Sequence, residues 1–397
     1  MMASDVALGV IVFALVLFLY AYFGYPAMLW VVGIVRRQPD LPDGEPDVWP
    51  VVSVTVPAYN EEDQIRELIK SLLALDYPRD RLQILIVSDA STDGTDDIVR
   101  EYEDRGVELL RMPTRGGKTR AENAAAEVLR GEIVVNTDAS IRIARPALKE
   151  LVRVFRDPGV GCASGRDVSV GPGDEMGNVG ESGYVGYEMR IRDLETRVSG
   201  IIGSSGCFYA IRPELHRLPL PVSLSRDFAS ALHTREHGYR TVSVPEAVCH
   251  VPRTTSLKKE YRRKVRTITR GMETLWHKRA LLDPFRYGAF SWMLFSHKVC
   301  RWMLPPVGIA ALVALVTLAS RNTVALGLVM VAAVVLTLAA VGWRLSERSS
   351  VPRVFSIPAF LVAGNLAAAH ALVRALSGDR DALWEPTRRE VVKAGES

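Results

Sequence analysis

The sequence predicts an α/β fold, in which a domain with a mostly parallel sheet is combined with transmembrane α-helices at both ends of the chain. Between residues 51 and 250, short apolar β-branched runs alternate with runs of helical spacing, which is the pattern of βαβ units. Charged side chains are rare before residue 36 and in much of the segment after residue 283. Apolar runs in both regions have the length of about 20 residues that a helix needs to cross a bilayer.

The N-terminal apolar run lies between Asp5 and Arg36 and contains no charged residue. A cleaved signal peptide is the competing interpretation, but the run is too long for one and no Lys or Arg precedes it. We therefore predict a retained anchor at residues 1–35, with its C-terminal end in the cytoplasm because Arg36 and Arg37 follow it. Residues 36–50 are rich in Pro and acidic side chains, which predicts a linker.

The C-terminal part, residues 284–376, is predicted to hold an interfacial helix and transmembrane helices. Phe285–Cys300 carries the aromatic and basic side chains typical of a helix that lies in the membrane interface. Three apolar runs follow, and a polar tail ends the chain at 377–397. Three spans would place this tail outside, whereas its composition suits the cytoplasm, so the sequence leaves its side open. The runs are Trp302–Ser320, Asn322–Trp343 and Val354–Val373.

Basic residues gather just before the C-terminal apolar part, although the formal net charge of the chain is only +4. Nucleic-acid binding is one interpretation of a basic stretch. A stretch on the cytoplasmic side of membrane spans has the same composition, and the apolar runs that follow favour it. We therefore expect a lipid bilayer and no nucleic acid as partner. The stretch comprises Lys258, Lys259, Arg262, Arg263, Lys264, Arg266, Arg270, Lys278 and Arg279.

The four cysteines are far apart in the sequence and show no spacing typical of a metal site. This favours free thiols in a reducing compartment and argues against zinc. They are Cys162, Cys207, Cys249 and Cys300.

Residues 51–283 are predicted to form one cytoplasmic domain in which strands and helices alternate. Ligands of such sheets bind at the carboxyl ends of the strands, so the loops that follow the strands are the place to look for chemistry. The expected strands are Val51–Val56, Leu82–Val87, Val107–Leu110 and Glu132–Asn136. The expected helices are Glu61–Leu75, Asp96–Glu103 and Thr119–Leu129.

Three of these strands end in short polar loops with an acidic residue: PAYNEE at 57–62, SDASTDGT at 88–95 and TDAS at 137–140. In any single loop, such a residue is as readily explained as the cap of the next helix. Three loops at one edge of one sheet favour a binding site instead. Carboxylates there can accept hydrogen bonds from a base and a ribose, or hold a divalent cation that bridges phosphates.

Further motifs follow these loops in a fixed order. They are GGKTRAEN at 116–123, GSSGCFYAIRPEL at 203–215, SRDFASALHTREHGYRTVSVPEAV at 225–248 and YRRKVRTITRG at 261–271. Over about residues 50–300 the series resembles the family 2 inverting glycosyltransferases with the GT-A fold, in particular the membrane branch related to cellulose, hyaluronan and poly-N-acetylglucosamine synthases. The resemblance implies a GT-A, Rossmann-like domain that binds a nucleotide-sugar donor.

The resemblance places the donor at the first strand ends. Asp89 corresponds to a carboxylate that contacts the uracil ring, while Asp93 in the same loop is equally well explained as a helix cap. Lys118 corresponds to a cation that approaches the diphosphate, and a solvated lysine in a glycine-bearing turn is the alternative. The implied base and ribose pocket consists of Ala58, Tyr59, Asn60 and Glu61.

Asp138 matches the first Asp of the family's DxD metal motif, but Ser140 occupies the position of the second. A hydroxyl is a weaker and neutral ligand, so the coordination differs from that of the family. We still expect Mg²⁺ or Mn²⁺, held by Asp138 and the donor, because a departing diphosphate develops charge that has to be neutralised.

Asp227 matches the family's catalytic aspartate, which takes the proton of the acceptor hydroxyl in a single in-line displacement. The family often has Glu before it; here Arg226 stands there, and we expect its charge to favour the ionised Asp227. A cap of the helix Phe228–Glu236 is the alternative role for Asp227, and one residue can fill both. Arg266 lies in a segment similar to the QxxRW motif and is the expected diphosphate clamp. The Gln and Trp of that motif are absent, which weakens a processive-polymerase interpretation.

Gly206, Cys207 and Phe208 resemble a loop near the acceptor, in which Cys207 is more readily a small buried residue than a nucleophile. On the helix expected around residues 187–195, Glu188 and Arg192 have the spacing of a solvated ion pair.

These residues imply an inverting transfer from a nucleotide-sugar donor, with UDP expected, to a polysaccharide or lipid-linked acceptor at the cytoplasmic face of the cell membrane. A catalytically silent subunit of a polysaccharide synthesis or export complex is the alternative, motivated by Ser140 and Arg226. A transporter is disfavoured, since the spans are few and contain no ionisable pair. A continuous translocation channel would need this bundle of spans, oligomerisation or an export partner, and the sequence leaves these alternatives open.

Overall fold

The structure is a computed structural model that describes residues 2–36, 38, 40–170, 179–252, 256–346 and 351–378. Most of the polar tail expected at 377–397 therefore lies outside the described residues. The chain forms two compact units. Among the described residues, the helical unit consists of those within Met1–Val35, Thr254–Met272 and Leu282–Asp379, and the sheet unit of those within Arg36–Arg253 and Glu273–Leu281.

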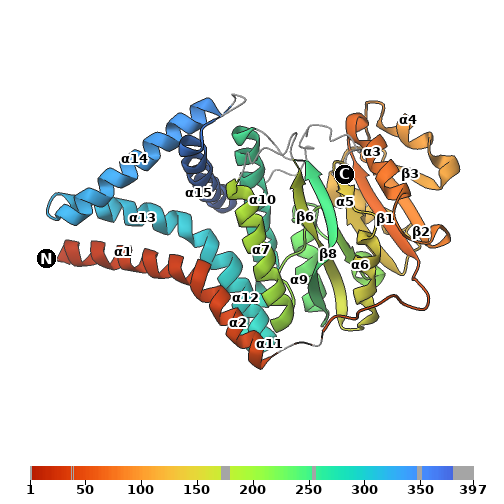
Figure 1. The fold of residues 1–397 in the computed structure, drawn as a ribbon, viewed down its shortest axis with the longest axis horizontal. Helices are drawn as coiled ribbons and strands as arrows, with labels where there is room; N and C mark the ends of the chain where they lie inside the picture. Colours follow the sequence, from red (N-terminus) through yellow and green to blue (C-terminus); the bar gives the residue numbers. More distant parts are fainter. Residues whose placement is uncertain are drawn as a thin grey trace. The chain divides into compact units, whose positions relative to one another are not determined.

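The sheet unit is built on one eight-stranded sheet (Figure 1). Its strands are β1 (Val52–Ala58), β2 (Leu82–Ser88), β3 (Val107–Arg111), β4 (Ile133–Thr137), β5 (Arg142–Ile143), β6 (Val160–Val170), β7 (Phe208–Ile211) and β8 (Arg240–Pro252). They are ordered β3-β2-β1-β4-β7-β6-β8-β5. β1 to β4 are parallel, as are β6 and β8, while β7 runs antiparallel between β4 and β6 and β5 is antiparallel to β8. The predicted α/β class is confirmed, and the sheet is mixed.

Helices cover both faces of this sheet. On one face, α3 (Glu62–Leu73), α4 (Thr95–Arg100) and α6 (Ala147–Arg153) share a buried core with the strands. On the other face, α5 (Lys118–Ala125) and α8 (Pro213–His216) share a second core with them. α9 (Arg226–Glu236) packs against α8, β6 and β8, and α7 (Val179–Val198) packs against β8.

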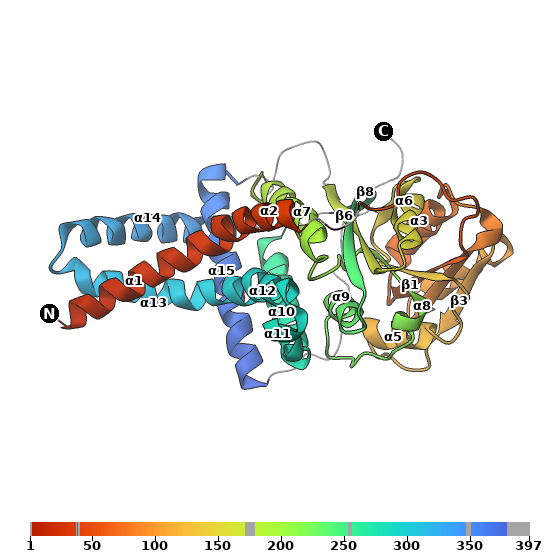
Figure 2. The same cartoon turned by 90° about the horizontal axis from the view of Figure 1, so that it is seen from below.

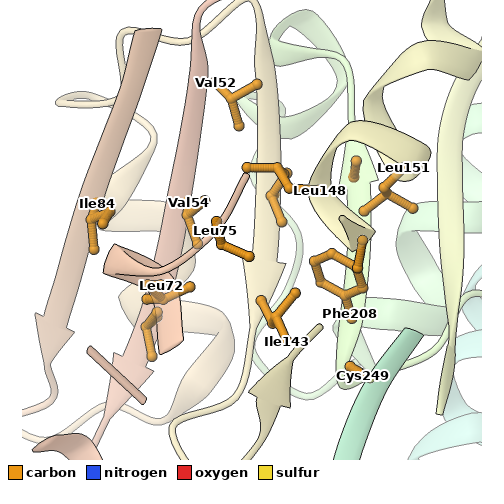
Figure 3. Close-up of a cluster of buried hydrophobic side chains, with 14 of the residues drawn as sticks. Val52, Val54, Leu72, Leu75, Ile84, Ile143, Leu148, Leu151, Phe208 and Cys249 are labelled. Atoms are coloured by element: carbon orange, nitrogen blue, oxygen red, sulfur yellow. The ribbon is translucent and has the colours of Figure 1, made fainter. Parts of the chain in front are cut away.

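The larger core follows directly from the periodicity of the sequence. Val52 and Val54 of β1 point into it, because alternate residues of a strand face the same side of the sheet (Figure 3). α3 contributes Ile65, Leu68 and Leu72, which recur at helical spacing and are fully buried. Full burial of one such side chain contributes about 1.5–3 kcal/mol to the free energy of folding.

The predicted strands and helices of the first half all occur, and their bounds differ by a few residues. The clearest difference is α5, expected over Thr119–Leu129, which ends at Ala125. The chain turns there because Leu129 packs into the second core and Gly131 then passes against Ser53 at the start of β1.

The helical unit contains four helices that are long and apolar enough to cross a membrane, judged by length and composition among the described residues. They are Ser4–Val35, Ala289–Ala319, Thr323–Leu345 and Arg353–Ser377. The first comprises α1 (Met2–Leu19), a π-helical turn at Tyr20–Gly24 and α2 (Tyr25–Val35). Large apolar side chains such as Phe13 and Val16 are more than half exposed on it, which suits a lipid environment.

These helices pack into a bundle. α1 lies along α13 (Arg301–Ala319), and α14 (Thr323–Leu345) packs against both α13 and α15 (Arg353–Ser377) (Figure 2). Polar groups inside the bundle find partners: Trp292 Nε1 donates to Tyr20 Oη at 2.9 Å, and Tyr20 Oη lies 2.6 Å from Ser296 Oγ. This is required where water is excluded.

Two expected boundaries differ in the helical unit. The interfacial helix predicted at Phe285–Cys300 is not a separate element. A short helix, α11 (Pro284–Tyr287), ends at Gly288, whose φ is +55°. From Ala289 the chain continues as α12 (Ala289–Leu294) and a π-helical turn into α13. The prediction placed the break at residue 300, where no glycine or proline interrupts the helix; proline appears only at Pro305.

The segment 254–272 was expected in the sheet domain but groups with the helical unit. It forms most of α10 (Leu257–His277). Val265 of α10 packs in one apolar cluster with Ala367 and Ala371 of α15, which explains the grouping. Arg266 therefore belongs to the helical unit, and its role as a diphosphate clamp stays a prediction.

Gly131→Ala should destabilise the sheet unit. A Cβ at Gly131 would lie 2.7 Å from the carbonyl oxygen of Ile133 and 2.9 Å from Ser53 Oγ, and backbone cannot yield as a side-chain end can. We expect a loss of about 1–3 kcal/mol in the free energy of unfolding, the usual cost of overpacking. Thermal unfolding of the detergent-purified chain measures it. Gly186→Ala is the matched control, because nothing lies within 4 Å of its added Cβ and alanine favours a helix. Equal unfolding temperatures for the two variants would contradict the packing described here.

Candidate active site

The loops after β1 and β2 lie side by side, since Ala58 is in register with Ser88. Each loop contains a non-glycine residue with positive φ: Asn60 at +52° and Ala90 at +58°. Asn60 is held there by the neighbouring loop, because Asn60 Oδ1 accepts the backbone N–H of Thr92 at 2.8 Å. Backbone in this region persists only where the surroundings impose it, and such residues cluster at functional sites.

Asp89 ties the loop before α5 to the end of β2. Its carboxylate accepts the backbone N–H groups of Gly116 and Gly117, each at 2.7 Å, and its side chain is buried. Gly117 has a φ of +83°, a conformation that favours glycine. The resemblance implies that Asp89 contacts the uracil ring of the donor. In the structure, both carboxylate oxygens of Asp89 are hydrogen-bonded to the loop that precedes Lys118.

The predicted base pocket shows one flat surface. The guanidinium of Arg115 stacks on the ring of Tyr59 at 3.9 Å from its centroid. A planar aromatic and guanidinium pair is a surface on which a nucleotide base can stack. Ala58 is fully buried, and Glu61 is also buried, with its backbone N–H donating to Thr95 Oγ1 at 2.9 Å. Their side chains therefore support the pocket, while Tyr59 and Asn60 are partly exposed.

Asp93 accepts hydrogen bonds from two helix N-termini, which fits the helix-cap interpretation in function, although Gly94 is the residue at the cap position of α4. Its carboxylate accepts the backbone N–H of Thr95 at 3.1 Å, at the start of α4, and that of Glu62 at 3.2 Å, at the start of α3. A carboxylate at a helix N-terminus is favoured by the orphan N–H groups and the helix dipole.

Lys118 joins three of the predicted motifs. Its ammonium lies 2.5 Å from Asp138 Oδ1 and donates to the carbonyl oxygen of Gly206 at 3.0 Å. Burial alone would lower the pKa of Lys118, but the carboxylates of Asp138 and Glu122 outweigh it and raise the pKa. Lys118 is therefore a fixed cation at the end of β4, and the alternative of a solvated lysine is wrong.

The oxygen ligands at this edge fit a cation that a donor brings with it. The described residues contain no group of three or more His, Cys, Asp or Glu side chains that could hold a metal ion. Asp138 offers one carboxylate, already paired with Lys118, and Ser140 is buried. Mg²⁺ is commonly held by one or two carboxylates together with substrate phosphates rather than by an all-protein cage. The residues therefore fit a metal bound by Asp138 and a diphosphate.

Asp227 lies next to this centre. A Cβ added to Gly206 would lie 3.0 Å from Asp227 Oδ2 and would press on this carboxylate, so glycine allows the two to lie close together. Asp227 is the second residue of α9, and Ser225 Oγ donates to its Oδ1 at 2.7 Å. The residue at the cap position is Ser225, so the alternative that Asp227 is the N-cap is wrong. Its carboxylate still profits from the helix dipole in the first turn.

Arg226 does not act on Asp227 as expected. Successive residues of a helix point about 100° apart, and the Arg226 guanidinium is buried against α5 and α8. Its Nε lies 3.4 Å from Glu122 Oε2, and it donates to Asn123 Oδ1 and to the carbonyl oxygen of His216. Sequence analysis missed Glu122, although its position four residues after Lys118 on a predicted helix was a usable signal.

The predicted acceptor loop divides into exposed and buried parts. Phe208 is fully buried in the larger core, so an acceptor contact is wrong for this residue (Figure 3). Cys207 is partly exposed, and its carbonyl oxygen accepts a hydrogen bond from Thr137 Oγ1 at 2.9 Å. All four cysteines are free thiols, as expected. Beside this loop, Ser205 Oγ donates to Asp167 at 2.6 Å, a contact that no sequence signal revealed.

Arg192 supports the same loop from α7. It donates to the carbonyl oxygen of Gly203 at 3.0 Å and to Ser164 Oγ at 2.7 Å. The expectation that Arg192 belongs to a solvated face is therefore wrong, because this cation is directed at the backbone before Gly206.

Asp89→Asn should loosen the loop at residues 116–117. The amide offers one acceptor oxygen in place of two, so one of the two backbone N–H groups loses its partner. We expect faster hydrogen exchange at Gly116 and Gly117, read by mass spectrometry of a peptide covering both. Asp93→Asn is the matched control: it should accelerate exchange at Glu62 or Thr95, whichever loses its acceptor oxygen, and leave Gly116 and Gly117 unchanged. Unchanged hydrogen exchange at Gly116 and Gly117 in Asp89→Asn would refute the role of Asp89 in holding this loop.

Known proteins share this domain. Residues 53–212 match the family model for glycosyl transferase family 2. The chain is 39% identical over 95 residues to the probable glycosyltransferase YdaM of Bacillus subtilis, which covers 23% of each chain. It is 30% identical over 156 residues to the β-monoglucosyldiacylglycerol synthase of a Nostoc species, which covers 38% of this chain and 33% of that protein. These matches span a quarter to a third of the relatives' length.

A solved structure has a similar fold over nearly the whole chain. It is that of a mannosyltransferase from Pyrobaculum calidifontis in complex with GDP-mannose and Mn²⁺, with a TM-score of 0.70 and 24% identity. The similarity covers 94% of this chain and all of that one. The GT-A fold expected from the motifs is thereby confirmed, and residues 53–212 match the glycosyl transferase family 2 model, as the resemblance implied.

Proposed function

We propose that the chain is a membrane-bound inverting glycosyltransferase that moves a sugar from a nucleotide donor, UDP-linked, to a polysaccharide or lipid-linked acceptor. The observation that carries the proposal is the position of the Lys118 ammonium. It lies between Asp138 and the backbone of Gly206, and Gly206 in turn adjoins the carboxylate of Asp227. A cation suited to a diphosphate and a base suited to an acceptor thus meet at the carboxyl ends of the strands.

The donor half of the site consists of Tyr59, Asn60, Lys118 and Asp138. The base stacks on Tyr59, and the diphosphate lies against the Lys118 ammonium, whose charge offsets that of the departing nucleotide. Mg²⁺ or Mn²⁺, held by Asp138 and the diphosphate, would supply further neutralisation of the leaving group. Arg266, in the basic stretch of α10, is the proposed second clamp on the diphosphate.

The acceptor half is formed by Asp227 and the loop at Gly206 and Cys207. An inverting transfer is one displacement: the acceptor oxygen bonds to the anomeric carbon as the bond to the diphosphate breaks on the opposite face. The proton of the acceptor hydroxyl passes to the Asp227 carboxylate. The hydrogen bond from Ser225 Oγ keeps this carboxylate oriented before the acceptor arrives.

The helical unit supports a membrane location. Four apolar helices of spanning length flank the domain in sequence, and a basic stretch precedes the C-terminal three. Such a stretch favours the cytoplasmic side, where nucleotide sugars are available. One relative is named as a synthase of a glucosylated diacylglycerol, which supports a lipid as acceptor class. An export partner is proposed only for a polysaccharide product.

A catalytically silent subunit is the second candidate, because Ser140 replaces an acidic residue of the metal motif. The contacts of Lys118, Asp138 and Asp227 argue for an active enzyme. Measured release of UDP separates the two candidates.

Asp227→Asn should abolish sugar transfer while the chain stays folded. Loss of a general base costs about 10²–10⁴-fold in kcat. The measurement is UDP release by detergent-purified protein over a panel of UDP-sugars, with an added lipid or glycan acceptor. Asp97→Asn is the control, since Asp97 also lies in the first turn of a helix and pairs with the exposed Arg100. Wild-type turnover that persists in Asp227→Asn would exclude Asp227 as the base.

Removal of divalent cations with EDTA should lower turnover at least about tenfold, and Mn²⁺ or Mg²⁺ should restore it, because the Lys118 ammonium, which is paired with Asp138, only partly offsets the negative charge of a departing diphosphate. Binding of UDP to the wild type should also weaken in EDTA, as measured by calorimetry. Full activity and unchanged UDP affinity in EDTA would show that Lys118 performs this role without a metal.

A further inference from the structure

A second ion pair lies behind the Lys118–Asp138 pair and is fully removed from solvent. Glu122 of α5 and Arg226 of α9 approach to 3.4 Å, and their side chains are 0% and 3% exposed. Glu122 comes one helical turn after Lys118, and Arg226 directly precedes Asp227. The pair thus joins the helix that begins at the donor cation to the helix that begins at the proposed base.

The orientation of Arg226 is fixed from three sides. Its Nε faces Glu122, one terminal nitrogen donates to Asn123 Oδ1, and the other donates to the carbonyl oxygen of His216 at 3.3 Å. His216 Nε2 in turn lies 3.2 Å from Asn136 Oδ1, two residues before Asp138. The first turn of α9 is therefore anchored to α5, to α8 and through His216 to the end of β4.

The charges alternate from the donor side to the base side: Asp138, Lys118, Glu122 and Arg226. Burial, supported by the nearby anions Asp138 and Asp227, raises the pKa of Glu122, and the cations Lys118 and Arg226 offset part of that rise. Glu122 thus interacts electrostatically with four charged residues: Lys118, Arg226, Asp138 and Asp227. No other carboxylate among the described residues pairs with Arg226 in the structure.

A buried ion pair is a poor source of stability, because desolvation of two charges offsets most of their attraction. The consequence of this pair is geometric. Glu122 attracts the Arg226 guanidinium without a hydrogen bond between them, while the hydrogen bonds to Asn123 and His216 fix the direction of the guanidinium. Together these contacts set the position of the residue next to Arg226. A misplacement of a reacting group by about 1 Å can cost about 10²-fold in rate.

We propose that Glu122 and Arg226 are positioning residues that set the Asp227 carboxylate relative to the donor held at Lys118. This inference rests on the proposed function. Neither residue touches substrate; both act through the first turns of α5 and α9.

The test is a double-mutant cycle of Glu122→Gln, Arg226→Gln and the double variant, in the full-length detergent-purified chain. We expect each single variant to lower kcat about 10–100-fold with donor KM changed less than about threefold, since the base is displaced but donor contacts remain. The double variant should lose no more than the worse single variant, because both remove the same coupling.

The matched control is another largely buried ion pair of the sheet unit, Arg240 with Asp157. Burial works against the charge of Asp157, but hydrogen bonds from Arg240 and Gly159 outweigh it and lower its pKa. Asp157→Asn should lower the unfolding temperature at neutral pH, an effect lost as the pH falls through that lowered pKa, and leave kcat unchanged. Variants of Glu122 and Arg226 that behave like Asp157→Asn, or that reduce kcat additively, would overturn the inference.

Failure of the proposed function can be distinguished from failure of this inference. If the wild type turns over no donor, the function fails, and hydrogen exchange decides the positioning role. The backbone N–H of Ala229 donates to the carbonyl oxygen of Ser225 at 2.7 Å in the first turn of α9. Glu122→Gln should accelerate exchange there and Asp157→Asn should not; equal exchange in both would overturn the inference.

Discussion

The contact between the Lys118 ammonium and the Asp138 carboxylate is the constraint on which the rest of the site depends. It places a fixed cation at the carboxyl end of β4, which is the edge at which α/β sheets bind their ligands. Two features make this possible. Asp89 holds the glycine loop before α5, which fixes where the helix begins, and the carbonyl oxygen of Gly206 takes a further hydrogen bond of the ammonium. The Lys118 Nζ atom therefore contacts both Asp138 on the donor side and Gly206 on the acceptor side.

Beneath this contact the sheet unit buries two ionisable side chains of opposite sign and a histidine. Glu122, Arg226 and His216 lie in the second layer, and burial lowers the pKa of His216 well below its usual range, so it is neutral and its ring can hydrogen-bond to Asn136. Apolar side chains would fill the same volume at less cost. The charged layer is therefore better explained by the geometry it gives to the first turns of α5 and α9 than by stability.

The sequence alone predicted the alternation of strands and helices and the edge at which the polar loops converge, because burial periodicity and strand direction leave little freedom. It predicted less about side-chain direction. Arg226 was assigned to Asp227 by adjacency, although helix geometry turns it toward Glu122. Phe208 and Arg192 were misplaced for the same reason, since motif position does not reveal which face a side chain takes. The membership of 254–272 in the helical unit depends on the contact of Val265 with Ala367, which lies about a hundred residues away.

The central claim is that a donor diphosphate is received at Lys118 and Asp138. The most direct measurement is a crystal structure of the chain soaked with UDP and Mn²⁺, with anomalous diffraction to locate the metal. The account predicts a manganese peak within coordination distance of Asp138 and the β-phosphate, with the Lys118 ammonium on the same diphosphate. Nucleotide bound elsewhere, or a diphosphate out of reach of Lys118 while Lys118 stays paired with Asp138, would contradict it.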